Sequence, residues 1–62
     1  MLTKENIAEK LLEHRSSKKI TQAEVSKKSG VSVQTISAIE SGKIKPQSMT
    51  VFRIREYLKF NQ

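Results

Sequence analysis

The side chains in this sequence that could take part in chemistry are mostly amides, hydroxyls and ammonium groups. Cysteine is absent and His14 is the single histidine, so the chain has no set of thiolate or imidazole ligands for a metal ion. Two serines follow His14 closely, but this spacing does not by itself define a catalytic triad. A substrate pocket would also consume the core of a 62-residue domain. We therefore expect no enzyme, no metal site and no cofactor.

The balance of charges favours a polyanion as the binding partner. Twelve Lys and Arg residues against six Asp and Glu give a formal net charge of +6 at pH 7, which is a large field for a small body. The same charge could serve only to keep the protein in solution. No apolar run reaches the roughly 20 residues that cross a bilayer, and no signal peptide is recognisable. We therefore expect a cytoplasmic protein without a membrane partner.

Helices must position the polar residues, because the chain has only two glycines and one proline to interrupt them. The length allows one domain, residues 1–62, with an aliphatic core and marginal stability. The apolar spacing and the capping residues predict an all-α fold of four helices. These are a helix capped by Thr3 that ends near residue 15 or 16, two helices over about 22–28 and 33–41, and a fourth capped by Ser48.

The second and third helices have the clearest end signals. Thr21 and Glu24 have the spacing of a capping box at the start of the second helix. Gly30 can adopt the left-handed conformation that closes this helix, and Ser32 is a good N-cap for the next one. Two short helices joined by a brief turn that contains glycine define a helix-turn-helix, over about residues 21–41.

The packing requirements of this motif are met at six fixed positions. The second helix needs an apolar residue in its middle and a small residue at its closest approach to the third helix. The turn needs a residue that tolerates positive φ, followed by one that plugs the core, and the third helix needs two inward apolar residues. These positions hold, in that order, Val25, Ser26, Gly30, Val31, Ile36 and Ile39.

The chain resembles the Cro and phage-repressor type of helix-turn-helix, also called XRE-like, over the stretch ITQAEVSKKSGVSVQTISAIESGKIKP. The resemblance covers about residues 11–58 and implies a compact four-helix, lambda-repressor-like domain that binds double-stranded DNA. Two features differ from the family pattern. Ser26 stands where alanine is usual, and the fifth helix that the family often uses in dimer contacts has no full counterpart in these residues.

The resemblance implies a transcriptional regulator of bacterial or phage type, repressor or Cro-like, that binds a two-fold operator as a homodimer. The resemblance leaves open whether the dimer already exists in free solution or forms only on DNA. Such a protein works in the cytoplasm, or in the host cytoplasm if phage-encoded, and is nucleoid-associated when bound. The alternative is a protein-interaction module, an antitoxin or anti-repressor that binds another regulator. Leu2, Tyr57, Leu58 and Phe60 could supply its contact surface, but they could equally complete the core or form the homodimer.

The outward residues of the third helix are the expected base contacts, because a recognition helix directs its N-terminal part at base edges. They are Val33, Gln34, Ser37 and Ala38, with Thr35 toward the DNA backbone. Gln34 is the best base reader, since its amide can pair bidentately with adenine; the other interpretation is a solvated glutamine. Val33 either contacts a thymine methyl or packs within the protein. Direct readout is thin here, so DNA shape is expected to contribute to specificity.

Phosphate contacts are expected on both sides of the third helix. Thr21 and Gln22 begin the second helix, where free N–H groups and the helix dipole favour a phosphate. The resemblance implies that Gln22 clamps the DNA backbone and also braces Gln34. It implies a second clamp after the third helix, although the two lysines could equally lie in a solvated loop. The residues of the second clamp are Ser41, Lys43 and Lys45.

The resemblance also implies a structural ion pair that involves no DNA. In the family an arginine of the first helix pairs with a glutamate at the end of the third, and Arg15 and Glu40 occupy these positions. The pair is expected to lock the recognition helix to the rest of the domain.

Overall fold

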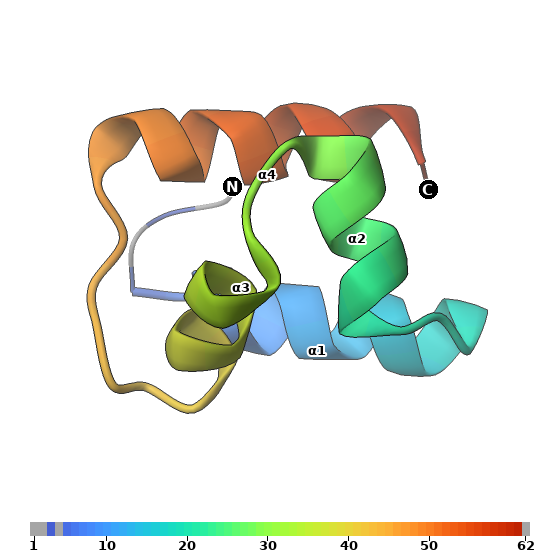
Figure 1. Cartoon of the computed structure of the whole chain (residues 1–62), viewed down its shortest axis with the longest axis horizontal. Coiled ribbons are helices and arrows are strands. Elements are labelled where there is room, and N and C mark those ends of the chain that lie inside the picture. Colours follow the sequence, from blue (N-terminus) through green and yellow to red (C-terminus); the bar gives the residue numbers. More distant parts are fainter. Residues whose placement is uncertain (1–2, 4, 62) are drawn as a thin grey trace.

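Four helices enclose one aliphatic core in the computed structural model, which describes residue 3 and residues 5–61 (Figure 1). Leu2, one of the residues considered for a contact surface, lies outside the described residues. No strand is found in the part of the chain that is described, so the prediction of an all-α fold is confirmed. The helices are α1 (Ile7–Lys18), α2 (Gln22–Ser29), α3 (Val33–Glu40) and α4 (Ser48–Phe60).

Helix α1 begins and ends later than its sequence signals predicted. Thr3 is not its N-cap: the Thr3 hydroxyl accepts a hydrogen bond from the Asn6 amide at 3.3 Å, and the Asn6 side chain accepts one from the Thr3 amide at 2.7 Å. This closed turn precedes the helix, which begins at Ile7. At the other end Lys19 takes the left-handed conformation, with φ of 57°, and its amide donates to the Arg15 carbonyl.

The predicted caps of α2 and α3 are present. The Thr21 hydroxyl accepts a hydrogen bond from the Glu24 amide at 3.2 Å, and the Ser32 hydroxyl accepts one from the Thr35 amide at 3.2 Å. Gly30 closes α2 with φ of 78°, a left-handed value that costs glycine little because it has no Cβ. The two hydroxyl caps satisfy N–H groups that the helices themselves leave without partners.

Three helix boundaries differ by one residue from the prediction. Helix α2 continues to Ser29, and α3 ends at Glu40 with Ser41 as its C-cap residue. Ser48 is the first residue of α4 rather than its cap, and the N-cap residue Gln47 makes no side-chain capping bond. Helix ends depend on one or two hydrogen bonds, so shifts of this size leave the packing unchanged.

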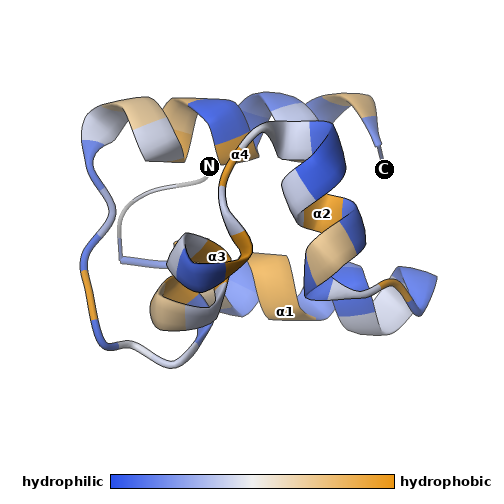
Figure 2. Ribbon diagram, viewed as in Figure 1, coloured by the Kyte–Doolittle hydropathy of each residue, from blue (hydrophilic) through white to orange (hydrophobic). Residues whose placement is uncertain are grey.

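The core joins all four helices and the turn between α2 and α3. Figure 2 shows hydrophobic and hydrophilic residues alternating along each helix, as expected where one side is buried. Tyr57, which sequence left between core and contact surface, is 4% exposed and belongs to the core, whereas Phe60 is 74% exposed. The buried residues are Ile7, Leu11, Val25, Val31, Ile36, Ile39, Val51, Ile54 and Tyr57.

Helix α3 packs against α1 and α2, and α4 packs mainly against α2 with a smaller contact to α1. Figure 1 shows α4 along one edge of the molecule, α1 along the opposite edge, and α3 in front. Among the described residues no helix is both long enough and apolar enough to span a bilayer.

Candidate DNA-binding surface

The outward side of α3 is open to solvent at the positions where a recognition helix would meet base edges. Val33 is 40% exposed, and Gln34 and Ser37 are also exposed. Thr35 and Ala38 are only half-buried, and the Thr35 hydroxyl oxygen accepts a hydrogen bond from Ser32 at 2.8 Å. The helix therefore presents one amide, one hydroxyl and one apolar side chain on a single face.

The charges on α3 suit an anionic ligand. Its first turn contains no acidic residue, so the partial positive charge of the helix N-terminus is not neutralised there. Its one carboxylate, Glu40, lies at the other end and forms an ion pair with Arg15, 2.7 Å from Nη2 to Oε1. The exposed face of the helix thus carries no free negative charge.

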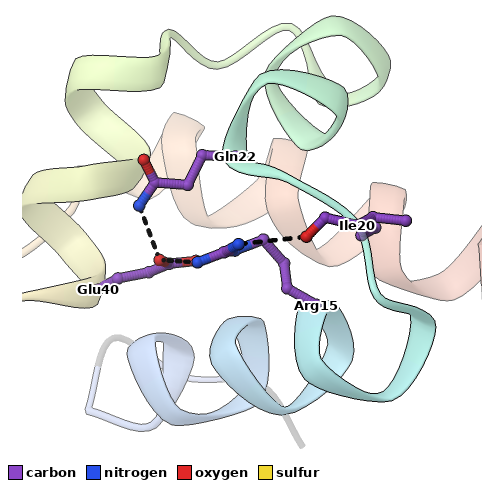
Figure 3. A network of polar contacts seen from close by, with 4 residues as sticks. All are labelled: Arg15, Ile20, Gln22 and Glu40. Carbon is purple, nitrogen blue, oxygen red and sulfur yellow. Dashed lines mark hydrogen bonds and ion pairs between the residues drawn. The ribbon is translucent and has the colours of Figure 1, made fainter.

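Arg15 and Glu40 form a bidentate pair between α1 and α3 (Figure 3). Arg15 Nε donates to one Glu40 oxygen at 2.8 Å and Nη2 donates to the other at 2.7 Å. Arg15 Nη1 also donates to the Ile20 carbonyl at 3.2 Å, in the link between α1 and α2. The side chains are 22% and 5% exposed, so both charges are held largely away from water.

The pair shifts the titration of both its members. The hydrogen bond to Glu40 raises the pKa of Arg15 above its ordinary value, against a smaller opposing effect of burial. Burial by itself raises the pKa of Glu40, but the hydrogen bonds from Arg15 and Gln22 and the arginine charge outweigh burial and lower the pKa. The glutamate therefore stays ionised in the folded protein at neutral pH.

Gln22 has a different partner from the one that the resemblance implied. Its amide nitrogen donates to Glu40 Oε1 at 2.9 Å, rather than bracing Gln34 (Figure 3). A carboxylate is the stronger acceptor, and Glu40 lies beside the N-terminal end of α2. One N–H of the Gln22 amide is not used in this bond. Gln22 therefore connects α2 to the ion pair and keeps a donor for another ligand.

The loop after α3 has a well-defined start. Gly42 takes a left-handed conformation with φ of 77°, and the Lys43 amide donates to the Ala38 carbonyl at 2.9 Å. The Ser41 hydroxyl donates to the same carbonyl at 3.1 Å. Lys43 and Lys45 are exposed beyond this turn, so their ammonium groups extend from a backbone that is tied to α3.

Two residues near this surface were missed by the sequence reasoning. Ile44 lies between Lys43 and Lys45 and is 47% exposed, and an isolated apolar residue between lysines was the available signal. Arg53 of α4 donates from Nη1 to the Gly30 carbonyl at 3.2 Å. That contact ties α4 to the turn of the motif, and no local pattern connects residues so far apart in sequence.

One comparison with known proteins agrees with this geometry. The family model described as helix-turn-helix matches residues 9–61, from the first turn of α1 to just beyond α4. The chain therefore belongs to the helix-turn-helix family of the XRE/Cro type, a family of DNA-binding regulators. No curated protein and no solved structure matches the chain.

Proposed function

We propose that this protein binds duplex DNA of a particular sequence and regulates transcription as a repressor or Cro-like protein. The observation that carries the proposal is the open face of α3, an exposed row of side chains on a helix held in place by Arg15 and Glu40. Such a helix can enter the major groove with its N-terminal residues against base edges.

The base contacts in this proposal come from Gln34, Val33 and Ser37, with Ala38 allowing close approach. Gln34 pairs with an adenine through its amide, and Val33 contacts a thymine methyl. The exposure of both side chains supports these roles. Few hydrogen-bonding groups are available, so sequence-dependent DNA shape contributes the rest of the specificity.

The backbone contacts form two clamps. Thr21 and Gln22 bind one phosphate at the N-terminus of α2, with Thr35 facing the same strand. Ser41, Lys43 and Lys45 bind another phosphate beyond α3. The free N–H of Gln22 and the exposed lysines support this arrangement. Phosphate contacts of this kind set the orientation of the protein but carry no sequence information.

A homodimer on a two-fold operator completes the proposal. One domain reads only a few base pairs, and two copies on half-sites about one helical turn apart double the footprint. The dimer forms either in solution or on DNA, and sedimentation of the protein with and without its operator separates the two cases.

Selection of bound sites from a random duplex pool tests the proposed function. We expect enrichment of one site with two-fold symmetry, together with an affinity that falls steeply as salt rises. Absence of measurable binding to any duplex at low salt would contradict the proposal. It would favour the alternative, an antitoxin or anti-repressor that uses the same fold to bind another regulator.

A further inference from the structure

The outward side of α4 carries two large aromatic rings that the core does not use. Val51, Ile54 and Tyr57 point into the core, while Phe52 and Phe60 are 48% and 74% exposed on the other side. Phe60 follows Phe52 by slightly more than two helical turns, about 12 Å along the axis at 1.5 Å per residue. Exposed aromatic residues that recur on one helix face are a common mark of a binding surface.

A shallow hollow of about 300 Å³ lies between this side of α4 and the C-terminal end of α2. Arg53 spans it, because its Nη1 donates to the Gly30 carbonyl just after α2. We call this hollow, with both rings, the α4 face. Its lining residues include Lys28, Phe52, Arg53, Glu56 and Phe60.

The charges around the α4 face are mainly positive. Lys28 and Arg53 line the hollow. Arg55 lies 5.9 Å from the centre of the Phe52 ring, and the Lys59 ammonium lies 5.5 Å from the centre of the Phe60 ring. Glu56 is the one carboxylate among the described residues that line the hollow or flank the rings. Four cations thus surround two apolar anchors and one central carboxylate.

We propose that the α4 face is a docking site for an acidic amphipathic helix of a partner protein. The partner helix places two apolar residues, seven or eight positions apart, against Phe52 and Phe60. Its Asp and Glu side chains face the four surrounding cations, and one basic residue faces Glu56. This inference does not rest on the proposed DNA binding, because the α4 face includes no residue of α3.

Charge separates this partner from the other candidates. A second copy of the chain would bring the same four cations against themselves, which disfavours self-association through this face. A single-stranded nucleic acid could stack bases on the two rings. However, its phosphates would then pass Glu56 between the rings, where like charges repel.

The test is a selection from a displayed library of helical 18-residue peptides with randomised surface positions, against the immobilised full chain. Selected peptides are expected to be enriched in Asp and Glu and to carry apolar pairs seven or eight positions apart. The Phe52→Ser/Phe60→Ser double variant should bind them at least about tenfold more weakly, and Lys28→Glu at least about threefold more weakly. Binding to Gln34→Ala should be unchanged, because this substitution alters only α3.

Two matched controls make the result specific. Met49→Ser removes another exposed apolar residue of α4, and Lys27→Glu reverses the neighbouring charge on α2, but neither residue lines the hollow. Both variants should keep their affinity for the peptides within about twofold. Thermal melts followed by circular dichroism check that each variant folds. If the double variant does not fold, the difference in peptide affinity between Lys28→Glu and Lys27→Glu tests the proposal instead.

Four outcomes would overturn the proposal. The first is a selected pool without an acidic excess, and the second is equal binding of the peptides by the double variant. The third is a labelled twelve-nucleotide oligothymidine that binds the wild type but not the double variant, which would assign the α4 face to nucleic acid. The fourth is a dimer in sedimentation that the double variant abolishes, which would assign it to a second copy.

Discussion

At the scale of single residues, two side chains show how packing and hydrogen bonding prepare the molecule for function. Gln34 is exposed on α3, which suits the base contact proposed for its amide. His14 is partly buried, and its Nε2 lies 2.8 Å from the Tyr57 hydroxyl in a contact between α1 and α4. The first residue offers a test of readout, and the second a test of stability.

Replacing Gln34 with alanine should relax the base preference at one position of each half-site. A bidentate amide–adenine contact contributes about 1–3 kcal/mol of discrimination, so the ratio of affinities for the preferred and altered base should fall by roughly tenfold or more. Titration of a panel of duplexes with single base changes measures this ratio. Equal weakening on every duplex would instead make Gln34 a backbone contact.

The stability of the protein should decrease as the pH falls from neutral toward the folded-state pKa of His14. Burial, aided by the charge of Lys18, lowers the pKa of His14 below its ordinary value of 6.5. Between these two pKa values the unfolded chain binds more protons than the folded chain, so acidification favours unfolding. Melting temperatures between pH 7.5 and 5.5 measure the effect. His14→Gln should flatten this part of the profile, and an unchanged slope would exclude His14 as its source.

At the scale of elements, the contact between α1, α2 and α3 fixes the orientation of α3 within the domain. Arg15 reaches from α1 to Glu40 at the end of α3, and Gln22 joins the same carboxylate from α2. Three helices therefore meet at one partly buried charge. The network therefore holds α3 in its place in the domain, together with the apolar core.

Removing Arg15 should destabilise the fold strongly. Arg15→Ala leaves the Glu40 carboxylate, whose side chain is 5% exposed, without its partner, and the loss should approach that of a fully buried pair, about 3–5 kcal/mol. For a domain of this size, 1 kcal/mol corresponds to about 4–8 °C, so the melting temperature should fall by well over about 10 °C. The double variant Arg15→Met/Glu40→Leu should recover much of this loss, because no charge is stranded. An unchanged melting temperature for Arg15→Ala would show that the Arg15–Glu40 pair does not stabilise the fold.

Acid should weaken this same junction. Burial opposes ionisation of Glu40, but the bonds from Arg15 and Gln22 outweigh it and hold its pKa below the ordinary 4.5. The stability from the charged form is therefore complete above about pH 4.5 and is lost as the pH falls through the folded-state pKa. Urea unfolding between pH 3 and 6 measures this loss. Glu40→Gln should show a shallower decline, and parallel curves for the two proteins would contradict the assignment.

At the scale of the whole molecule, positive charge lies both in the loop after α3 and around the aromatic rings of α4. The 62-residue chain has a formal net charge of +6, and the exposed Lys43 and Lys45 extend from the loop after α3. The exposed aromatic residues belong instead to α4. The DNA contacts and the protein contacts proposed above therefore use residues of different helices.

The affinity for DNA should depend on salt in proportion to the number of phosphates contacted. The logarithm of the affinity falls linearly with the logarithm of the salt concentration, with a slope of about −0.9 for each phosphate neutralised. Lys43→Ala should therefore reduce the slope by about one unit and weaken binding equally on all sequences. Lys27 lies near the C-terminal end of α2, away from the proposed phosphate contacts at Thr21 and Gln22. Lys27→Ala should therefore leave the slope nearly unchanged. If Lys43→Ala shows the same salt dependence as the wild type, Lys43 does not contact a phosphate.

The local parts of this protein were predictable because their signals act within a few residues. Thr21 and Ser32 cap helices through amides three positions further along the chain, and Gly30 closes α2 through its own φ. The apolar period likewise follows from helix geometry alone, and it identified the buried face of α3. The one-residue differences at helix ends, as at Ser41, arose because one or two hydrogen bonds decide where a helix stops.

Apart from the Arg15–Glu40 pair, which the family resemblance implied, the contacts between distant residues were decided only by the tertiary structure. Sequence alone determined that there are four helices, where the turn lies and which side of α3 faces outward, since each depends on neighbouring residues. It could not place Gln22 on Glu40, Arg53 on the Gly30 carbonyl or His14 beside Tyr57. These pairs are 18, 23 and 43 residues apart, and they form only because burial of the shared core brings their helices together.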